Sequence, residues 1–166
     1  AVPIPSGAAP LVVFFLIFCN ILFFANEFIL KSLTKHAADD VYKLIDSILI
    51  GDIKLSLRIL LSLQNEGMDA IIVIWALNRE LRLLSKLSFS VDSGMNQNEL
   101  MRNYRIWTSR QNIVLSCLNR HQTKDFHNMI KACTNADNVA KGQIKGEKWQ
   151  LIRNIILSLS AYNKAA

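Results

Sequence analysis

The sequence predicts an all-α fold, a compact bundle of about six helices preceded by an apolar N-terminal segment. From Asp39 onward, apolar residues recur at helical spacing, and glycines and capping residues separate the successive helical segments. No segment alternates apolar and polar residues for long enough to predict a strand, and all three prolines precede residue 11. The chain has 166 residues, 51% of them apolar, which suffices for one domain with a sizeable core.

The first 27 residues form an apolar segment unlike the rest of the chain. The run from Leu11 to Ala25 contains a single polar residue, Asn20, and residues 8–25 are close to the roughly 20 residues that cross a bilayer. A membrane span would place Lys31 on the cytoplasmic side. The alternatives are a buried helix of a larger parent protein, or sequence foreign to the fold.

Residues 28–38 are interpreted as a junction helix, and residues 39–162 as a helical domain. The first helix of this domain carries one apolar stripe that ends at Gly51, as expected of a C-terminal glycine. Asp52 is placed to cap the second helix, and Gly67 follows its end. The sequence therefore predicts that the domain opens with an antiparallel helix pair.

A third, longer helix is predicted to begin at the capping residue Asp69 and to end near Leu87. Its apolar positions are broad enough for packing on two sides. Its charged residues are expected to face largely outward: Arg79, Glu80, Arg82 and Lys86. The stretch Ser88–Asn98 is rich in Ser, Asn, Asp and Gly, and we predict that it forms the one long loop.

Further helices are predicted after this loop. Their expected bounds are Glu99–Tyr104, Thr108 or Ser109 to a break at His121, Thr123 to about Lys141, and about Glu147 onward. Thr123 is expected to be the cap of its helix. A plain interhelical loop with two glycines, residues 142–146, precedes the last helix, which is predicted to bury Trp149.

The net charge of +6 is unevenly distributed along the chain. Residues 31–96 carry eight basic and eight acidic side chains, whereas residues 97–166 carry eleven basic against four acidic. A basic half indicates an anionic partner or an acidic protein neighbour.

Nucleic acid is one such partner. Four arginines with two interleaved aromatic residues could contact phosphates and stack on bases: Arg102, Arg105, Arg110 and Arg120, with Tyr104 and Trp107. The alternative is a solvated face with two core aromatic residues, because no helix-turn-helix signature or Arg-rich recognition helix accompanies them.

We predict no catalytic, cofactor or metal site. The three histidines do not share a helix face and are each expected at the surface: His36, His121 and His127. The three cysteines are expected to fill the core of a protein from a reducing compartment: Cys19, Cys117 and Cys133. No P-loop motif is present, so ATP binding has no support in the sequence, and no acid/base pair or nucleophile signature occurs. We therefore expect no enzymatic activity from this chain by itself.

Several segments follow one another in an order typical of one known family. They are Asp40–Asp52 with its Gly-Asp turn, Leu57–Gly67 ending in Glu-Gly, Ala76–Leu84 with its Arg-Glu-Leu-Arg core, Trp107–Arg110, and Ala136–Gly142 followed by Trp149. From about Ala38 to Ala161 the chain thus resembles the C-terminal domain of the delta subunit of the bacterial DNA polymerase III clamp loader. Residues 1–27 match nothing in that family.

The resemblance implies a collar domain, which packs beside the equivalent domains of gamma/tau-type and delta-prime-type subunits in a pentameric ring. It therefore implies a cytoplasmic subunit-assembly domain that supports sliding-clamp loading in DNA replication, with DNA within reach of the complex. The ATPase-like domain and its clamp-opening helix would lie upstream, and nucleotidyl transfer would belong to another subunit. The residues we would test for interface or internal packing roles are Trp75, Arg79, Arg82, Trp107, Arg110, Lys141 and Trp149.

A membrane-tethered helical domain is the alternative interpretation. Residues 8–25 would anchor it in the inner membrane, and the basic half would meet anionic lipid or nucleic acid.

Overall fold

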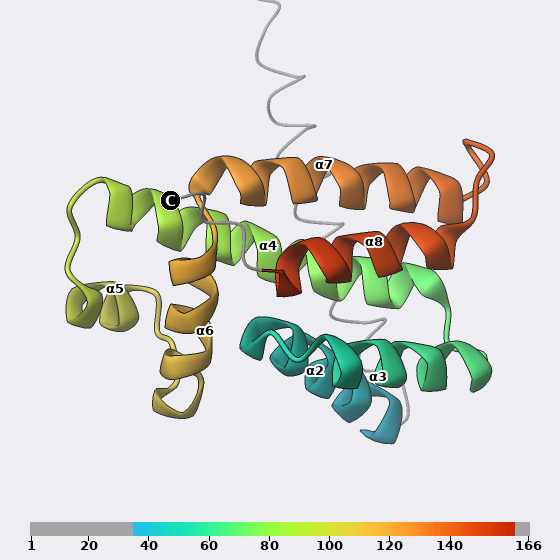
Figure 1. The fold of residues 1–166 in the computed structure, drawn as a ribbon, viewed down its shortest axis with the longest axis horizontal. Helices are drawn as coiled ribbons and strands as arrows, with labels where there is room; N and C mark the ends of the chain where they lie inside the picture. The colour runs from blue at the N-terminus through green and yellow to red at the C-terminus, as the bar shows by residue number, and fades with distance from the viewer. Residues whose placement is uncertain (1–34, 162–166) are drawn as a thin grey trace, which may run out of the picture.

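Seven α-helices make up residues 35–161, the part of the chain that the computed structural model describes (Figure 1). Their bounds are α2 Lys35–Ile50, α3 Ile53–Asn65, α4 Ala70–Asp92, α5 Gln97–Asn103, α6 Thr108–Arg120, α7 Thr123–Ala140 and α8 Lys148–Ser160. No strand occurs between the first and last of these helices. The predicted all-α fold class is therefore confirmed.

The proposed apolar segment and most of the proposed junction helix lie outside the described residues. Lys35 to Ala38 belong to α2, which continues without a break into the predicted domain. None of the helices from Lys35 to Ser160 is both long enough and apolar enough to cross a bilayer.

The capping residues predicted for α3 and α4 are confirmed. The Asp52 carboxylate accepts a hydrogen bond of 2.9 Å from the backbone N–H of Leu55, and the Asp69 carboxylate accepts one of 3.0 Å from Ile71. Each carboxylate satisfies a backbone donor that has no partner within its helix. These two helices therefore begin where the sequence predicts.

One core joins all the long helices. Helices α2 and α3, which are consecutive in the sequence, pack against each other, and so do α7 and α8. Helix α4 runs behind α8 and has its most extensive packing against α7 (Figure 1). Helix α8 also contacts α2 and α3, so the first and last described helices meet. The largest fully buried side chain is Phe126, in α7. Helices α5 and α6 form a corner at one side of the bundle (Figure 1).

The predicted long loop at Ser88–Asn98 is wrong. Helix α4 continues to Asp92, and α5 begins at Gln97, so the connection is only four residues long. The hydroxyl groups of Ser88 and Ser90 are accommodated within the helix because they have partners outside α4. Ser90 Oγ lies 2.9 Å from the hydroxyl of Tyr104, and Ser88 Oγ lies 2.8 Å from Thr123 Oγ1.

Thr123 is not the cap of α7, contrary to the prediction from its residue type. The cap is Gln122, whose backbone N–H donates a 2.9 Å hydrogen bond to the Asp125 carboxylate. Thr123 Oγ1 instead donates to the Asp92 carboxylate at 2.7 Å. The threonine therefore joins the start of α7 to the end of α4.

Candidate functional site

Arg110 joins three helices through its guanidinium group. Its Nη2 atom lies 3.0 Å from the Asp46 carboxylate on α2 and 3.2 Å from the Glu80 carboxylate on α4. Glu80 is only 8% exposed, which contradicts the prediction that it faces outward. Burial raises the pKa of Glu80, and the nearby Arg110 charge opposes that shift. Arg110 thus holds α2, α4 and α6 together within the domain.

Arg120 caps the C-terminal end of α2. It is 9% exposed, and it donates hydrogen bonds to the carbonyl oxygens of Ile48, Leu49 and Ile50 at 3.3, 2.6 and 3.2 Å. These carbonyls lie in the last turn of α2, where the helix supplies no i+4 donor, although the Ile48 carbonyl also accepts a 3.0 Å bond from the Gly51 N–H. Arg120 is therefore unavailable to phosphate groups, and its assignment to a nucleic-acid surface is wrong.

His121 is buried, contrary to the expectation that it lies at the surface. It is 3% exposed, and its Nε2 atom lies 2.8 Å from the Leu159 carbonyl oxygen in α8. Because a carbonyl only accepts, this nitrogen carries the proton. The ring meets Phe126 edge to face, with centroids 5.5 Å apart. Burial lowers the pKa of His121, and its Nδ1 atom has no hydrogen-bond partner in the described part of the chain.

The sequence carries one signal for this buried junction. Val114, Cys117 and His121 follow one another at i, i+3 and i+7, so His121 continues the apolar stripe of α6. Cys117 and Cys133 are fully buried, which confirms the prediction for these two cysteines. Burial raises the pKa of each thiol to about 12. No cluster of three or more metal-ligating side chains occurs among residues 35–161.

Trp107 stands at the corner between α5 and α6 and is 80% exposed. Arg102 and Arg105 are exposed beside it, and all three line a shallow hollow. Arg105 has a positive φ of 52°, an unusual conformation for a residue with a side chain, which shapes this corner. Tyr104 differs, since it is half-buried and its hydroxyl contacts Ser90. The corner therefore presents one exposed aromatic ring near two exposed cations.

The outward side of α4 carries a second group of basic and aromatic residues. The Arg79 guanidinium lies 5.7 Å from the centre of the half-buried Trp75 ring, and Arg82 Nε donates to Asn78 at 3.2 Å. The same side continues with further exposed residues. We call the whole set the α4 basic face: Trp75, Arg79, Arg82, Lys86 and Phe89.

The remaining candidates lie elsewhere. Lys141 follows the end of α7 and pairs with Asp137 one turn earlier. Trp149 is half-buried in the first turn of α8 and packs against the core. The seven residues selected from the sequence therefore do not form one site. Trp75, Arg79 and Arg82 share the α4 basic face. Trp107 lies at the α5–α6 corner, and Arg110 lies in the ion-pair network with Asp46 and Glu80.

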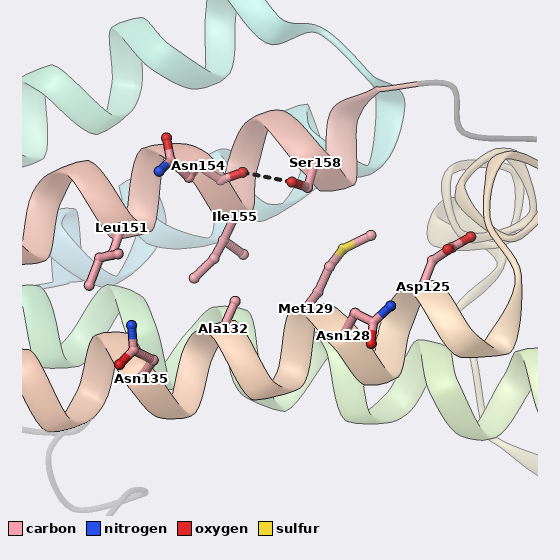
Figure 2. Close-up of a pocket in the computed structure, with 9 residues that line it drawn as sticks. All are labelled: Asp125, Asn128, Met129, Ala132, Asn135, Leu151, Asn154, Ile155 and Ser158. Carbon is pink, nitrogen blue, oxygen red and sulfur yellow. Dashed lines mark hydrogen bonds between the residues drawn. The ribbon is translucent and has the colours of Figure 1, made fainter.

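A groove between α7 and α8 is the third surface feature (Figure 2). Met129, Ala132, Leu151 and Ile155 form its apolar part. Amide and hydroxyl groups supply its polar lining: Asn128, Asn135, Asn154 and Ser158, with Asp125 as its one acid. Ser158 Oγ already donates to the Asn154 backbone carbonyl at 2.9 Å. These groups offer neither a nucleophile with a base nor a set of metal ligands.

Comparison with known proteins identifies the family. The family model for the C-terminal domain of the DNA polymerase III delta subunit matches residues 38–159, which contain nearly the whole helical bundle. The chain is also similar to DNA polymerase III subunit delta of Haemophilus influenzae, with 26% identity over 116 residues. That match covers 65% of this chain but only 34%, about a third, of the relative. The chain belongs to the family of C-terminal domains of DNA polymerase III delta subunits.

Proposed function

We propose that this chain supplies a subunit-assembly domain of a DNA polymerase III clamp loader. It would pack helix faces against gamma/tau-type and delta-prime-type subunits and so support the loading of sliding clamps during DNA replication. The family match over residues 38–159 carries the proposal. The structure agrees with it, because the bundle completes its own core and still presents large side chains outward, such as Trp107 and Phe89.

We assign no catalytic step to this chain by itself, and we place its work in the cytoplasm, where the chromosome is copied. Three titratable side chains in the described part of the chain have partners within the fold. Glu80 and Arg110 are engaged with each other, and His121 is buried against a backbone carbonyl.

Co-purification tests the assembly role directly. The full chain is co-expressed with the gamma/tau-type and delta-prime-type subunits encoded in the same genome, and the mixture is separated by size-exclusion chromatography. We expect the chain to elute with at least one of them. A chain that is helical by circular dichroism yet elutes alone would overturn the proposal.

DNA contact at the α5–α6 corner is a second candidate function. The 80% exposure of Trp107, which lines one hollow with the exposed Arg102 and Arg105, favours it, since stacking on a base is worth about 1–3 kcal/mol. Fluorescence anisotropy with a labelled single-stranded oligonucleotide measures it. Trp107→Ala should weaken binding by about tenfold, whereas the control Arg153→Ala, which removes an exposed cation on α8, should change it little. Equal affinity of Trp107→Ala and the wild type would exclude this contact.

A further inference from the structure

The α4 basic face is a continuous strip along one side of the longest helix. Its residues follow one another at i, i+4, i+7, i+11 and i+14, which places them on one side of the helix over about 21 Å. Arg79, Arg82 and Lys86 are exposed, and Phe89 is 65% exposed. The strip therefore consists of three cations with an aromatic residue at each end.

The three cations form no ion pair in the part of the chain that the structure describes. Within residues 35–161, none of them has a carboxylate oxygen within 4.0 Å. Glu80, the acid in the middle of α4, lies on the buried side of the helix and contacts Arg110. Asp92, at the end of α4, accepts the hydrogen bond from Thr123. Both acids of α4 are thus committed elsewhere.

The face is also held rigidly. Leu77, Leu81 and Leu84 on the opposite side of α4 are fully buried, and the helix packs along α7. A partner therefore meets cations that recur at helical spacing along α4. The rise is about 4.5 Å from Arg79 to Arg82 and about 6 Å from Arg82 to Lys86.

We propose that the α4 basic face docks an acidic amphipathic helix of another clamp-loader subunit. The inference rests on the proposed function, and it names the chemistry of the partner. Carboxylates at i, i+3 or i+4, and i+7 of a helix recur at the same rises as the three cations, so they can pair turn by turn. Apolar residues at the two ends of that helix would cover Trp75 and Phe89, and Trp and Arg are typical anchors of protein interfaces.

A protein helix fits this face better than a nucleic acid does. The Trp75 ring is half-buried and has the Arg79 guanidinium over it, so no base can stack on that side of the ring. The face is the convex side of one helix, whereas strand-binding proteins surround the backbone with a charged groove. Phe89 is the only freely exposed ring of the five residues.

Charge reversal on the full chain tests the inference. The variant R79E/R82E/K86E is compared with K54E/R58E/R153E, which makes the same change of net charge at exposed positions of α3 and α8. Each is co-expressed with the gamma/tau-type and delta-prime-type subunits after circular dichroism has shown that it folds. We expect at least tenfold weaker binding for the α4 variant and little change for the control. Equal weakening of both variants would overturn the role of this particular face.

Phe89→Ser keeps the test valid if the triple variant fails to fold. Phe89 is 65% exposed, so its truncation leaves the core intact, and Tyr42→Ser on α2, which is 51% exposed in the wild type, is the matched control. We expect at least threefold weaker subunit binding for Phe89→Ser alone. Unchanged binding would contradict the inference.

The outcomes separate the two proposals. If the wild-type chain binds no loader subunit, the proposed function fails. If the wild type binds and the α4 variants bind equally well, the function stands and the α4 docking site is wrong. If the α4 variants keep the subunits but lose affinity for a labelled oligonucleotide, the face binds nucleic acid and the helix-docking inference is also wrong.

Discussion

The guanidinium of Arg120 donates a 2.6 Å hydrogen bond to the carbonyl oxygen of Leu49, which lies 71 positions earlier in the chain. Arg120→Met should therefore leave several carbonyl oxygens at the end of α2 without this donor. We expect a loss of about 3 kcal/mol in the free energy of unfolding, measured by urea denaturation. Arg102→Met, at an exposed position, should change it by less than about 0.5 kcal/mol. Similar losses in the two variants would refute the capping role.

Gly51 and Gly67 offer a matched pair for testing the packing around Arg120. Both have positive φ, 91° and 78°, so alanine is strained at either position by about 1 kcal/mol. A Cβ atom at position 51 would also lie 3.3 Å from Arg120 Nη1 and 3.4 Å from the Ser160 carbonyl oxygen, whereas position 67 has nothing within 4 Å. Gly51→Ala should therefore lower the urea midpoint more than Gly67→Ala. Equal midpoints would show that Arg120 moves aside at no cost.

Arg110→Met should destabilise the domain by about 2 kcal/mol at pH 7, because Glu80 would then keep a buried charge without its counter-ion. The pKa of Glu80 is raised in the folded state, chiefly by burial, so between pH 4.5 and that raised pKa the folded chain holds a proton that the unfolded chain has lost. Its contribution to stability consequently falls as pH rises, and more steeply once Arg110 is removed. Adding Glu80→Gln to Arg110→Met should flatten this dependence in urea titrations at pH 4.5 and pH 7. If the pH dependence of stability persists in the double variant, another titratable group causes it.

His121 should make the domain less stable in mild acid. Its pKa is lowered by burial, so near and below pH 6.5 the unfolded chain binds a proton that the folded chain does not. Stability contributed by the neutral ring is present above pH 6.5 and is lost as pH falls through the folded pKa. Unfolding midpoints at pH 7.5 and pH 5.5 measure the loss, and His121→Gln should show a smaller difference between them. The same difference in both proteins would exclude His121 as its source.

The sequence predicted those elements that depend on local chemistry. Asp52 and Asp69 cap the helices expected of them because capping needs only a side-chain oxygen near the first free N–H groups. Gly51 ends α2 for a similar reason, since its φ of 91° suits a residue without a Cβ atom. These interactions span at most a few residues, so the local pattern of residue types predicts them.

The predictions are wrong where a polar residue has a partner that is distant in the sequence. Ser88 and Ser90 suggest a loop, yet Thr123 and Tyr104 supply partners that keep them inside α4. Arg120 suggests a phosphate contact, although α2 supplies the carbonyl groups that hold it. Of the surface candidates, Trp107 could be selected as an aromatic residue among arginines, but its exposure depends on how the α5–α6 corner folds.

The contact of α8 with α2 and α3 has a consequence for synthesis of the protein on the ribosome. The apolar surface of α2 and α3 that packs against α8 is covered only when the helix that begins at Lys148 has left the exit tunnel. A nascent chain that stops before Lys148 exposes this apolar surface to chaperones and to other nascent chains. This apolar surface is therefore buried only after Lys148–Ser160 has left the exit tunnel.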